Sequence, residues 1–375
     1  MFNTSIPAQA SWNPATFADS QGFVLATNDN PRLTAYIWNP SSGLSASYQP
    51  SSDWGENPKG LSARKQGGYI AVCSNSRWSV YNFDAGSGFG SLNHDESLSN
   101  VRAVRFSPYG NTLAVATSSG VNLYDFTPVS GVGSLTQSVE TGVTSITDVD
   151  FSPDGSHFLI VGQGGDVLEV YPVRNRKNVA PLGEGQVCST PPRLAGENSG
   201  AGDKYGFCKV SGRCENGQYY YCYESDHKVY YGRIINGVPD SPSTINYGNF
   251  AQPFGLSFVP DKNLLVTTQS TAYSSYFSSG TDLRSFALSD NVSSINDENS
   301  VGSFAMQLGT SNLGGLGYNV AYMANYDAIV VANWDNYGNT HPLTTFTIAS
   351  SGAFTEVTRP VASGTVNDGK LVDWL

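Results

Sequence analysis

Four histidines are the first candidates for acid–base or metal chemistry in this sequence: His94, His157, His227 and His341. No two of them have the spacing of a metal pair such as H-x-x-x-H, and no G-x-S-x-G nucleophile motif or phosphate-binding glycine loop is present. Calcium loops of the D-x-D-x-D-G kind are also missing. The sequence therefore predicts no catalytic set, no metal site and no cofactor.

The chain has five cysteines, Cys73, Cys188, Cys208, Cys214 and Cys222. An odd number without an export signal predicts free thiols. If the hairpin around 208–222 keeps the register of its counterpart at 101–117, Cys208 lies directly opposite Cys222, which makes them a candidate cross-strand thiol pair. Zinc held by Cys208, Cys214, Cys222 and His227 is not expected, because their spacing matches no common zinc site.

Six aromatic residues fall in long loops beside Ser, Asn and Asp: Trp54, Tyr273, Tyr276, Phe277, Trp334 and Tyr337. A rigid aromatic body with small polar neighbours is typical of adaptable recognition surfaces and of stacking on sugar rings. We take these residues as candidates for binding a protein or glycan partner. The alternative is that they fold back and fill gaps between neighbouring sheets.

The elements that must position these residues are seven copies of one strand–turn–strand pattern. The clearest copies are VRAVRFSPYGNTLAVAT at 101–117 and ITDVDFSPDGSHFLIVG at 146–162. In each, an apolar residue precedes a turn rich in Pro, Asp and Gly, and an apolar run follows it, which predicts two antiparallel strands. The residues before the seven turns are Phe17, Ala63, Phe106, Phe151, Val210, Phe258 and Tyr322.

A third strand is expected after each pair, at 34–38, 79–83, 122–126, 168–173, 228–234, 283–288 and 343–348. In most copies a Gly-containing turn then leads to a short fourth strand. Four antiparallel strands repeated at about 45 residues are typical of a propeller blade. The sequence therefore predicts an all-β, seven-bladed β-propeller of four-stranded antiparallel blades; two tandem β-sandwiches are the alternative.

The predicted propeller covers 13–361, between an N-terminal arm at 1–12 and a C-terminal tail at 362–375. We expect every blade to hold its own strands, and both ends to clasp the outside of the ring or reach a neighbouring molecule. The longest loops fall on one face of the disc. Arg102 and Asp148 open strands in adjacent blades near the channel mouth, where a salt bridge or a solvated charge is the favoured interpretation.

The FSPDG-type turn and the V-x-L-Y-D strand resemble those of WD-repeat propellers and of lactonase-type propellers with YVTN-style repeats. This resemblance covers nearly the whole chain and implies the architecture, although the Gly-His and Trp-Asp dipeptides of WD repeats are absent. A lactonase resemblance also implies acid, His and Arg residues at the channel mouth, and a full set does not map onto this chain. The low charge and the abundance of Ser, Asn, Gly and Tyr resemble phage virion proteins.

The net charge of −11 argues against nucleic acid or an anionic membrane as the main partner, since both need clustered cations. The N-terminus has no signal-peptide pattern and no window is apolar enough for membrane insertion, so we expect synthesis in the cytoplasm, with a virion as a second location. The favoured function is a non-enzymatic structural or interaction propeller that binds protein or glycan through its long-loop face, such as a decoration or tail-associated virion component. The alternative is a lactonase-type propeller hydrolase with a site at the channel mouth.

Overall fold

The computed structural model describes residues 21–27, 32–39, 43–64, 66–84, 87–165, 168–174, 178–179, 186–187, 208–212, 214, 217–225, 228–246, 252–270, 283–288, 295–296, 300–304, 316–323, 327–334, 343–358 and 369–374. Within these ranges the regular structure is almost entirely strand, and the one helical element is the 3-10 turn η1 (Pro260–Lys262). In the same part of the chain, no helix is long and apolar enough to cross a membrane. The chain is therefore all-β.

The described strands form seven sheets. The first contains β1 (Gln21–Thr27), β2 (Leu33–Asn39), β3 (Gly43–Tyr48) and β31 (Gly369–Trp374). The second contains β4 (Gly60–Ala63), β5 (Tyr69–Cys73), β6 (Arg77–Asp84) and β7 (Gly88–Ser97). The third contains β8 (Val101–Phe106), β9 (Thr112–Thr117), β10 (Gly120–Thr127) and β11 (Gly131–Val139). The fourth contains β12 (Val143–Phe151), β13 (His157–Gly165), β14 (Leu168–Arg174), β15 (Asn178–Val179) and β16 (Gln186–Val187).

The remaining three sheets follow the same plan. The fifth contains β17 (Cys208–Val210), β18 (Tyr219–Ser225), β19 (Lys228–Ile235), β20 (Val238–Pro239), β21 (Ser243–Asn246) and β25 (Ile295–Asn296), the last of which pairs with β21 in parallel. The sixth contains β22 (Gln252–Val259), β23 (Leu264–Ser270), β24 (Leu283–Ala287) and β26 (Gly302–Phe304). The seventh contains β27 (Leu316–Met323), β28 (Ala328–Trp334), β29 (Leu343–Ile348) and β30 (Phe354–Thr358). All seven predicted third strands coincide with observed ones.

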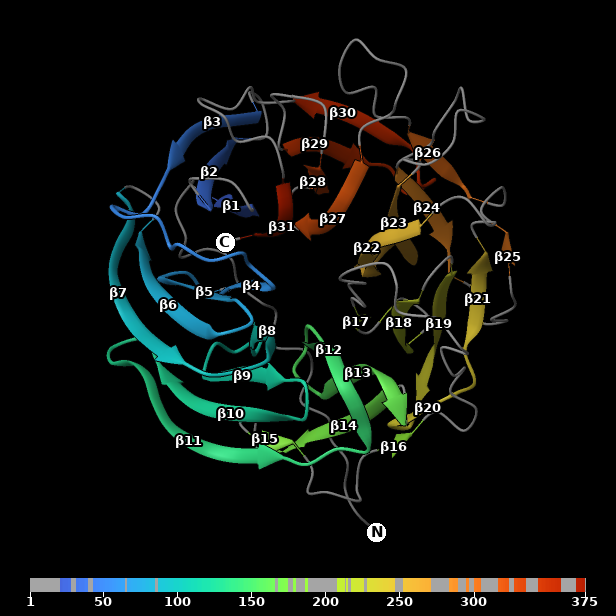
Figure 1. Cartoon of the computed structure of the whole chain (residues 1–375). Helices are drawn as coiled ribbons and strands as arrows, with labels where there is room; N and C mark the ends of the chain where they lie inside the picture. Colours follow the sequence, from blue (N-terminus) through green and yellow to red (C-terminus); the bar gives the residue numbers. More distant parts are fainter. Residues whose placement is uncertain are drawn as a thin grey trace, which may run out of the picture.

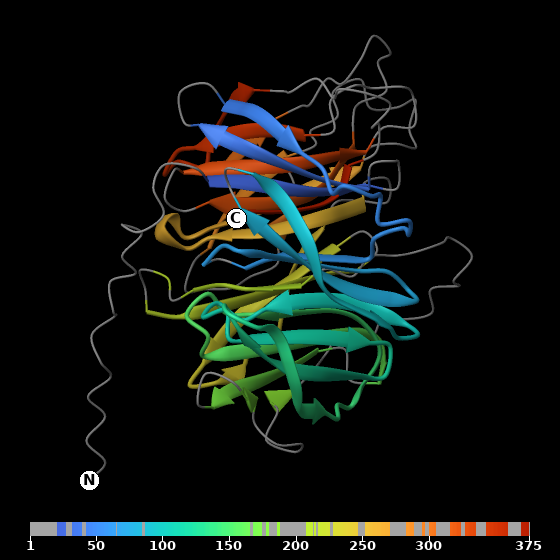
Figure 2. The same ribbon diagram turned by 90° about the vertical axis from the view of Figure 1, so that its left-hand side faces the viewer.

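One strand of each sheet lies nearest to a common axis, in the order β31, β4, β8, β12, β17, β22 and β27 around the ring (Figure 1). Each of these inner strands packs against the next, and β27 packs against β31, so the ring is closed. Figure 2 shows the ring from its side, with the blue to green sheets toward the viewer. The arrangement is an all-β propeller of four-stranded antiparallel sheets.

The first sheet corrects the prediction that seven blades each hold their own strands. In each of the other six sheets, the inner strand is followed directly along the chain by the strand with which it pairs. The first sheet instead combines β1–β3 with β31 from the other end of the chain. The segment expected to clasp the outside of the ring is therefore its innermost strand, with Trp374 opposite Phe23, and the propeller extends beyond 361. Pairing with β31 satisfies backbone groups of β1 that would otherwise be an open sheet edge at the axis. Phe17 and the arm at 1–12 lie outside the described residues.

The repeated turn explains why the inner hairpins form where the sequence predicts them. Phe106 pairs with Leu113, and the Gly110 N–H donates to the Ser107 carbonyl at 2.7 Å. Gly110 has a φ of +61°, a left-handed conformation that glycine adopts without steric cost. The turn between β12 and β13 repeats this arrangement at Ser152 and Gly155. Apolar side chains on both faces of the middle strands then form clusters between neighbouring sheets.

Candidate active site

A group of buried and half-buried charged residues lies on the inner strands of the third, fourth and fifth sheets and on the strand next to the last of these. Arg105 on β8, Asp150 on β12 and Lys209 on β17 each stand one residue before the end of their strand. Asp148 on β12 and Glu224 on β18 complete the set. We call these five residues the inner-strand cluster.

Arg105 joins three neighbouring blades. Its Nη1 donates to the Leu61 carbonyl of β4 at 2.8 Å and to the Val104 carbonyl at 3.1 Å. Its Nη2 donates to both carboxylate oxygens of Asp148, at 3.1 and 3.2 Å, and its Nε lies 3.8 Å from Asp150 Oδ1. The guanidinium thus offsets the charge of two carboxylates on the next inner strand.

Both aspartates of the inner-strand cluster also bind the backbone of β17. The Cys208 N–H donates to Asp148 Oδ2 at 3.1 Å, and the Val210 N–H donates to Asp150 Oδ2 at 3.1 Å. Burial raises the pKa of Asp150 above its usual value, although the charges of Lys209 and Arg105 act to lower it. Asp150 is therefore a carboxylate held closer to the pH at which it can exchange a proton.

Glu224 is the least satisfied member of the inner-strand cluster. The residue is buried, and its Oε2 has no hydrogen-bond partner among the described residues. Burial raises the pKa of this carboxyl well above its usual range, and the negative charge of Asp148 adds to the shift. A buried carboxyl without a compensating partner favours its neutral form, so Glu224 is a candidate proton donor.

Sequence reasoning missed this cluster except for Asp148. Arg102 and Asp148, which were expected to approach the channel mouth, do not pair; Asp148 pairs with Arg105 and is buried within β12. The sequence feature that could have revealed the cluster is the residue before the last in an inner strand. This residue is charged in three successive blades, as Arg105, Asp150 and Lys209.

Trp54 does not present an exposed recognition surface. Its side chain is only 3% exposed and packs with Leu33, Leu61 and Ile70 between the first and second sheets. This placement fits the alternative interpretation, in which a loop aromatic fills a gap between blades.

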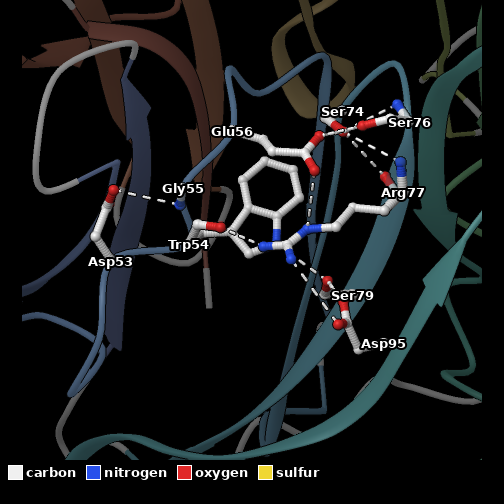
Figure 3. Close-up of polar contacts among 9 residues, drawn as sticks. All are labelled: Asp53, Trp54, Gly55, Glu56, Ser74, Ser76, Arg77, Ser79 and Asp95. Carbon is white, nitrogen blue, oxygen red and sulfur yellow. Dashed lines mark hydrogen bonds and ion pairs between the residues drawn. The ribbon is translucent and has the colours of Figure 1, made fainter.

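A polar network holds Trp54 in this position (Figure 3). Trp54 Nε1 donates to Ser79 Oγ at 3.0 Å, and Ser79 Oγ donates to Asp95 Oδ1 at 2.5 Å. The Arg77 guanidinium lies 5.0 Å from the indole centre and forms ion pairs with Glu56 at 3.5 Å and with Asp95 at 3.9 Å. We call Trp54, Glu56, Arg77, Ser79 and Asp95 the Trp54 cluster.

Glu56 contrasts with Glu224 because its carboxylate is well partnered. It accepts hydrogen bonds from the hydroxyls of Ser74 and Ser76. Burial acts to raise its pKa, but these two hydrogen bonds and the charge of Arg77 outweigh it and hold the pKa below the usual value. The Glu56 carboxylate is therefore satisfied, and the cluster holds Trp54 in the packing between two blades.

The other aromatic candidates are not brought into a site by the described part of the chain. Tyr273, Tyr276, Phe277 and Tyr337 lie outside the described residues. Trp334 ends β28, where its backbone pairs with Leu316, and its side chain also lies outside the described part. Their assignment to partner binding stays a prediction.

The cysteines correct the predicted register. Cys208 pairs with Tyr223, and Cys222 pairs with Lys209, so the two thiols lie on opposite faces of the sheet. The reason is the turn: ten residues, 211–220, separate the paired residues Val210 and Tyr221, whereas six, 107–112, separate the corresponding pair in the third sheet. This difference of four residues shifts the pairing by one position from the predicted Cys208–Cys222 register.

The described thiols are free and poorly suited to reaction. Cys73, Cys208, Cys214 and Cys222 form no disulfide, and Cys188 lies outside the described residues. Burial raises the pKa of the Cys208 and Cys222 thiols well above the usual value, which suppresses the reactive thiolate. No group of three or more His, Cys, Asp or Glu side chains suited to a metal occurs among the described residues.

The two described histidines belong to local contacts. His157 is buried, its Nδ1 lies 2.7 Å from Ser156 Oγ, and burial lowers its pKa. His94 stacks on Trp78, with ring centres 4.2 Å apart, and its Nε2 lies 3.3 Å from Glu96. Neither lies in the inner-strand cluster; His227 and His341 lie outside the described residues.

No family model matches the sequence, and no curated protein matches it. Solved structures do match. A provisionally named 6-phosphogluconolactonase from Bacteroides fragilis is 15% identical, with 97% of this chain and 100% of that chain covered and a TM-score of 0.65. A second provisionally named 6-phosphogluconolactonase, from Bacteroides uniformis, is 14% identical, with 95% and 100% covered and a TM-score of 0.66. The periplasmic gluconolactonase of Pseudomonas aeruginosa is 14% identical, with 95% and 99% covered and a TM-score of 0.60.

At these identities the likeness shows the propeller fold. It also corrects the expectation of a non-enzymatic structural propeller, because the neighbours are named as lactonases and favour the lactonase-type alternative. The phage virion role has no support in these neighbours. The expectation that the chain is not an enzyme is withdrawn with it.

Proposed function

We propose that this protein is a lactonase-type hydrolase that opens a cyclic ester at the inner-strand cluster. We also propose that its ring is a seven-bladed propeller. The observation that carries the proposal is Glu224, a buried carboxyl beside the Arg105–Asp148–Asp150 network, with one oxygen that has no partner among the described residues. Unsatisfied buried carboxyls with raised pKa values concentrate at catalytic sites, because proton transfer needs them. The lactonase names of the structural neighbours support the same reaction class.

The two carboxyls suit the two proton transfers of lactone hydrolysis. Asp150 would accept a proton from water as the water oxygen attacks the lactone carbonyl. Glu224, held neutral by burial, would give its proton to the ring oxygen when the carbon–oxygen bond breaks. The product is an open hydroxy acid, and a proton transfer between the carboxyls through solvent restores the starting state. Two carboxyls with different environments are a recurrent solution for acid–base pairs.

Arg105 would act as a positioning residue for this chemistry. It donates two hydrogen bonds to Asp148 and its Nε lies 3.8 Å from Asp150 Oδ1, so it keeps these two carboxylates aligned. The side chains of Arg105 and Asp150 retain 12% and 14% exposure, so they are not sealed from solvent. Solvent contact at this point is necessary for water to reach Asp150.

A lactone panel tests the proposal. Glucono-δ-lactone and its 6-phosphate ester, with simple γ- and δ-lactones, would be incubated with the full chain in a pH-stat, which counts the acid released. We expect acid release above the buffer rate for at least one sugar lactone, lost in Asp150→Asn and retained in Glu140→Gln, a matched change at an exposed residue. No release from any lactone, or full release by Asp150→Asn, would refute the proposal.

A further inference from the structure

Lys209 is the member of the inner-strand cluster to which the proposed reaction gives no role. It is the middle residue of β17, which packs against β12 of the fourth sheet and pairs with β18 of its own sheet (Figure 1). Asp150 lies on β12, and Glu224 lies on β18. Lys209 therefore stands on the strand between the proposed base and the proposed acid.

The backbone on both sides of Lys209 is held by carboxylates of β12. The Cys208 N–H donates to Asp148 Oδ2 and the Val210 N–H donates to Asp150 Oδ2, each at 3.1 Å. The side chains of Cys208 and Val210 are buried in the apolar cluster between the fourth and fifth sheets. Successive side chains of a strand point to opposite faces, so the Lys209 side chain leaves the strand on the other side.

Lys209 and its cross-strand partner Cys222 share one face of the fifth sheet. Glu224 stands two residues after Cys222 on β18 and shares this face. Burial raises the pKa of the Cys222 thiol, and the charge of Lys209 acts to lower it. The charges of Asp150 and Glu224 act on the same thiol. The base, the cation and the acid thus lie within electrostatic reach of one point beside the inner strand.

The Lys209 ammonium is available to a ligand. The residue is half-buried, so part of it reaches solvent, and it forms no hydrogen bond or ion pair with the described residues. The Arg105 guanidinium, by contrast, already donates to the Leu61 carbonyl and to Asp148. An ammonium carries three N–H donors, and in a partly desolvated site it stabilises a developing negative charge more strongly than water does.

We propose that Lys209 is a further catalytic residue, which binds the carbonyl oxygen of the lactone as that oxygen becomes negatively charged. This role rests on the proposed function. As the water oxygen bonds to the carbonyl carbon, a proton of the water passes to Asp150 and the carbonyl electron pair moves onto the oxygen beside the Lys209 ammonium. When the electron pair returns, the bond from the carbon to the ring oxygen breaks, and Glu224 gives its proton to the ring oxygen.

Initial rates of the full chain on glucono-δ-lactone and on its 6-phosphate ester test this role. Lys209→Met keeps most of the side-chain length without the charge, so kcat should fall by about 100-fold on both lactones, with KM within about threefold of the wild type. Lys209→Arg keeps the positive charge and should retain more of the rate. Lys228→Met, which removes an exposed lysine of the same sheet, should open both lactones as the wild type does.

The pH profile separates this role from a merely structural one. Burial raises the pKa of Asp150, and the charge of Lys209 acts to lower it. Lys209→Met should therefore move the rising limb of kcat/KM, which reports the ionisation of Asp150, to higher pH, whereas Lys209→Arg should leave this limb in place. A loss of folded protein alone would lower the rate without moving the limb.

Melting temperatures show whether each variant is folded, and Lys209→Gln replaces Lys209→Met if the methionine variant does not fold. Equal kcat in Lys209→Met and wild type would overturn the role of Lys209 and leave the proposed function standing. A loss confined to the 6-phosphate ester would also overturn it, because Lys209 would then bind the phosphoryl group. A wild type that opens no lactone would contradict the proposed function and this role together.

Discussion

The Trp54 cluster and the inner-strand cluster both place charged groups beside the packing between blades, but they satisfy these groups differently. In the Trp54 cluster, Glu56 accepts two hydroxyl hydrogen bonds and an ion pair from Arg77, and its pKa is lowered. In the inner-strand cluster, one oxygen of Glu224 has no hydrogen-bond partner within the described part of the chain, and the pKa of this carboxyl is raised. A satisfied network stabilises the fold, whereas an unsatisfied carboxyl costs stability and is retained where chemistry needs it.

The largest effect is expected from Trp54→Ala. Removing the indole leaves a cavity between the first and second sheets. It also removes the ring that Arg77 faces and the N–H that donates to Ser79 Oγ. We expect a loss of about 3–5 kcal/mol in the free energy of unfolding, measured by urea denaturation. A loss under about 1 kcal/mol would contradict the role of Trp54 as a buried wedge between blades.

Glu224→Gln should change the rate of lactone opening rather than the free energy of unfolding. The amide keeps the shape of the carboxyl but cannot donate an acidic proton, so lactone opening should slow by about 100-fold. The free energy of unfolding should stay constant or rise, because an ionisable group without a partner leaves the core. Denaturant unfolding and initial rates on the same preparation separate the two outcomes; a large loss of stability would place Glu224 among the structural groups.

Ser79→Ala tests the hydrogen bonds of the Trp54 cluster without removing its aromatic body. The substitution leaves the buried Trp54 Nε1 and one oxygen of Asp95 without their shared partner. The expected cost is about 1–3 kcal/mol in the free energy of unfolding, with lactone opening unchanged. Equal stability of Ser79→Ala and wild type would mean that the hydroxyl is not needed to hold the indole.

The smallest effects are the pH dependences of stability, which should differ in sign. Since the pKa of Glu224 is raised in the folded state, its contribution favours folding at low pH and is lost as pH rises from about 4.5 through that raised pKa. Since the pKa of Glu56 is lowered, its contribution is present above about 4.5 and is lost as pH falls through the lowered value. Urea midpoints against pH for Glu224→Gln and Glu56→Gln should deviate from wild type in opposite directions; deviations of the same sign would contradict the comparison.

The repeated hairpin was predictable because turn chemistry and apolar anchors are local properties of the sequence. Phe106 does pair with Leu113, and every predicted third strand is observed. Closure of the ring was not predictable in the same way, because β31 and β1 lie at opposite ends of the chain and no hairpin turn connects them. The register at Cys208 failed because a single residue in a loop decides it.

The candidate site was harder to predict than the fold. Arg105 and Asp150 become partners only when two inner strands from different repeats lie side by side. Glu224 stands out because its Oε2 has no partner in the described ranges, and this cannot be recognised before the neighbouring strands are placed. Trp54 was noticed for its residue type, but its burial depends on how the connection between the first two sheets packs.

The most direct test of the account is the pH dependence of lactone opening by wild type and by Glu224→Gln. If Glu224 supplies the proton to the leaving oxygen, wild-type kcat/KM should fall as pH rises through the raised pKa of Glu224, and this falling limb should be absent in Glu224→Gln. The same falling limb in both proteins would contradict the assignment of Glu224 as the acid.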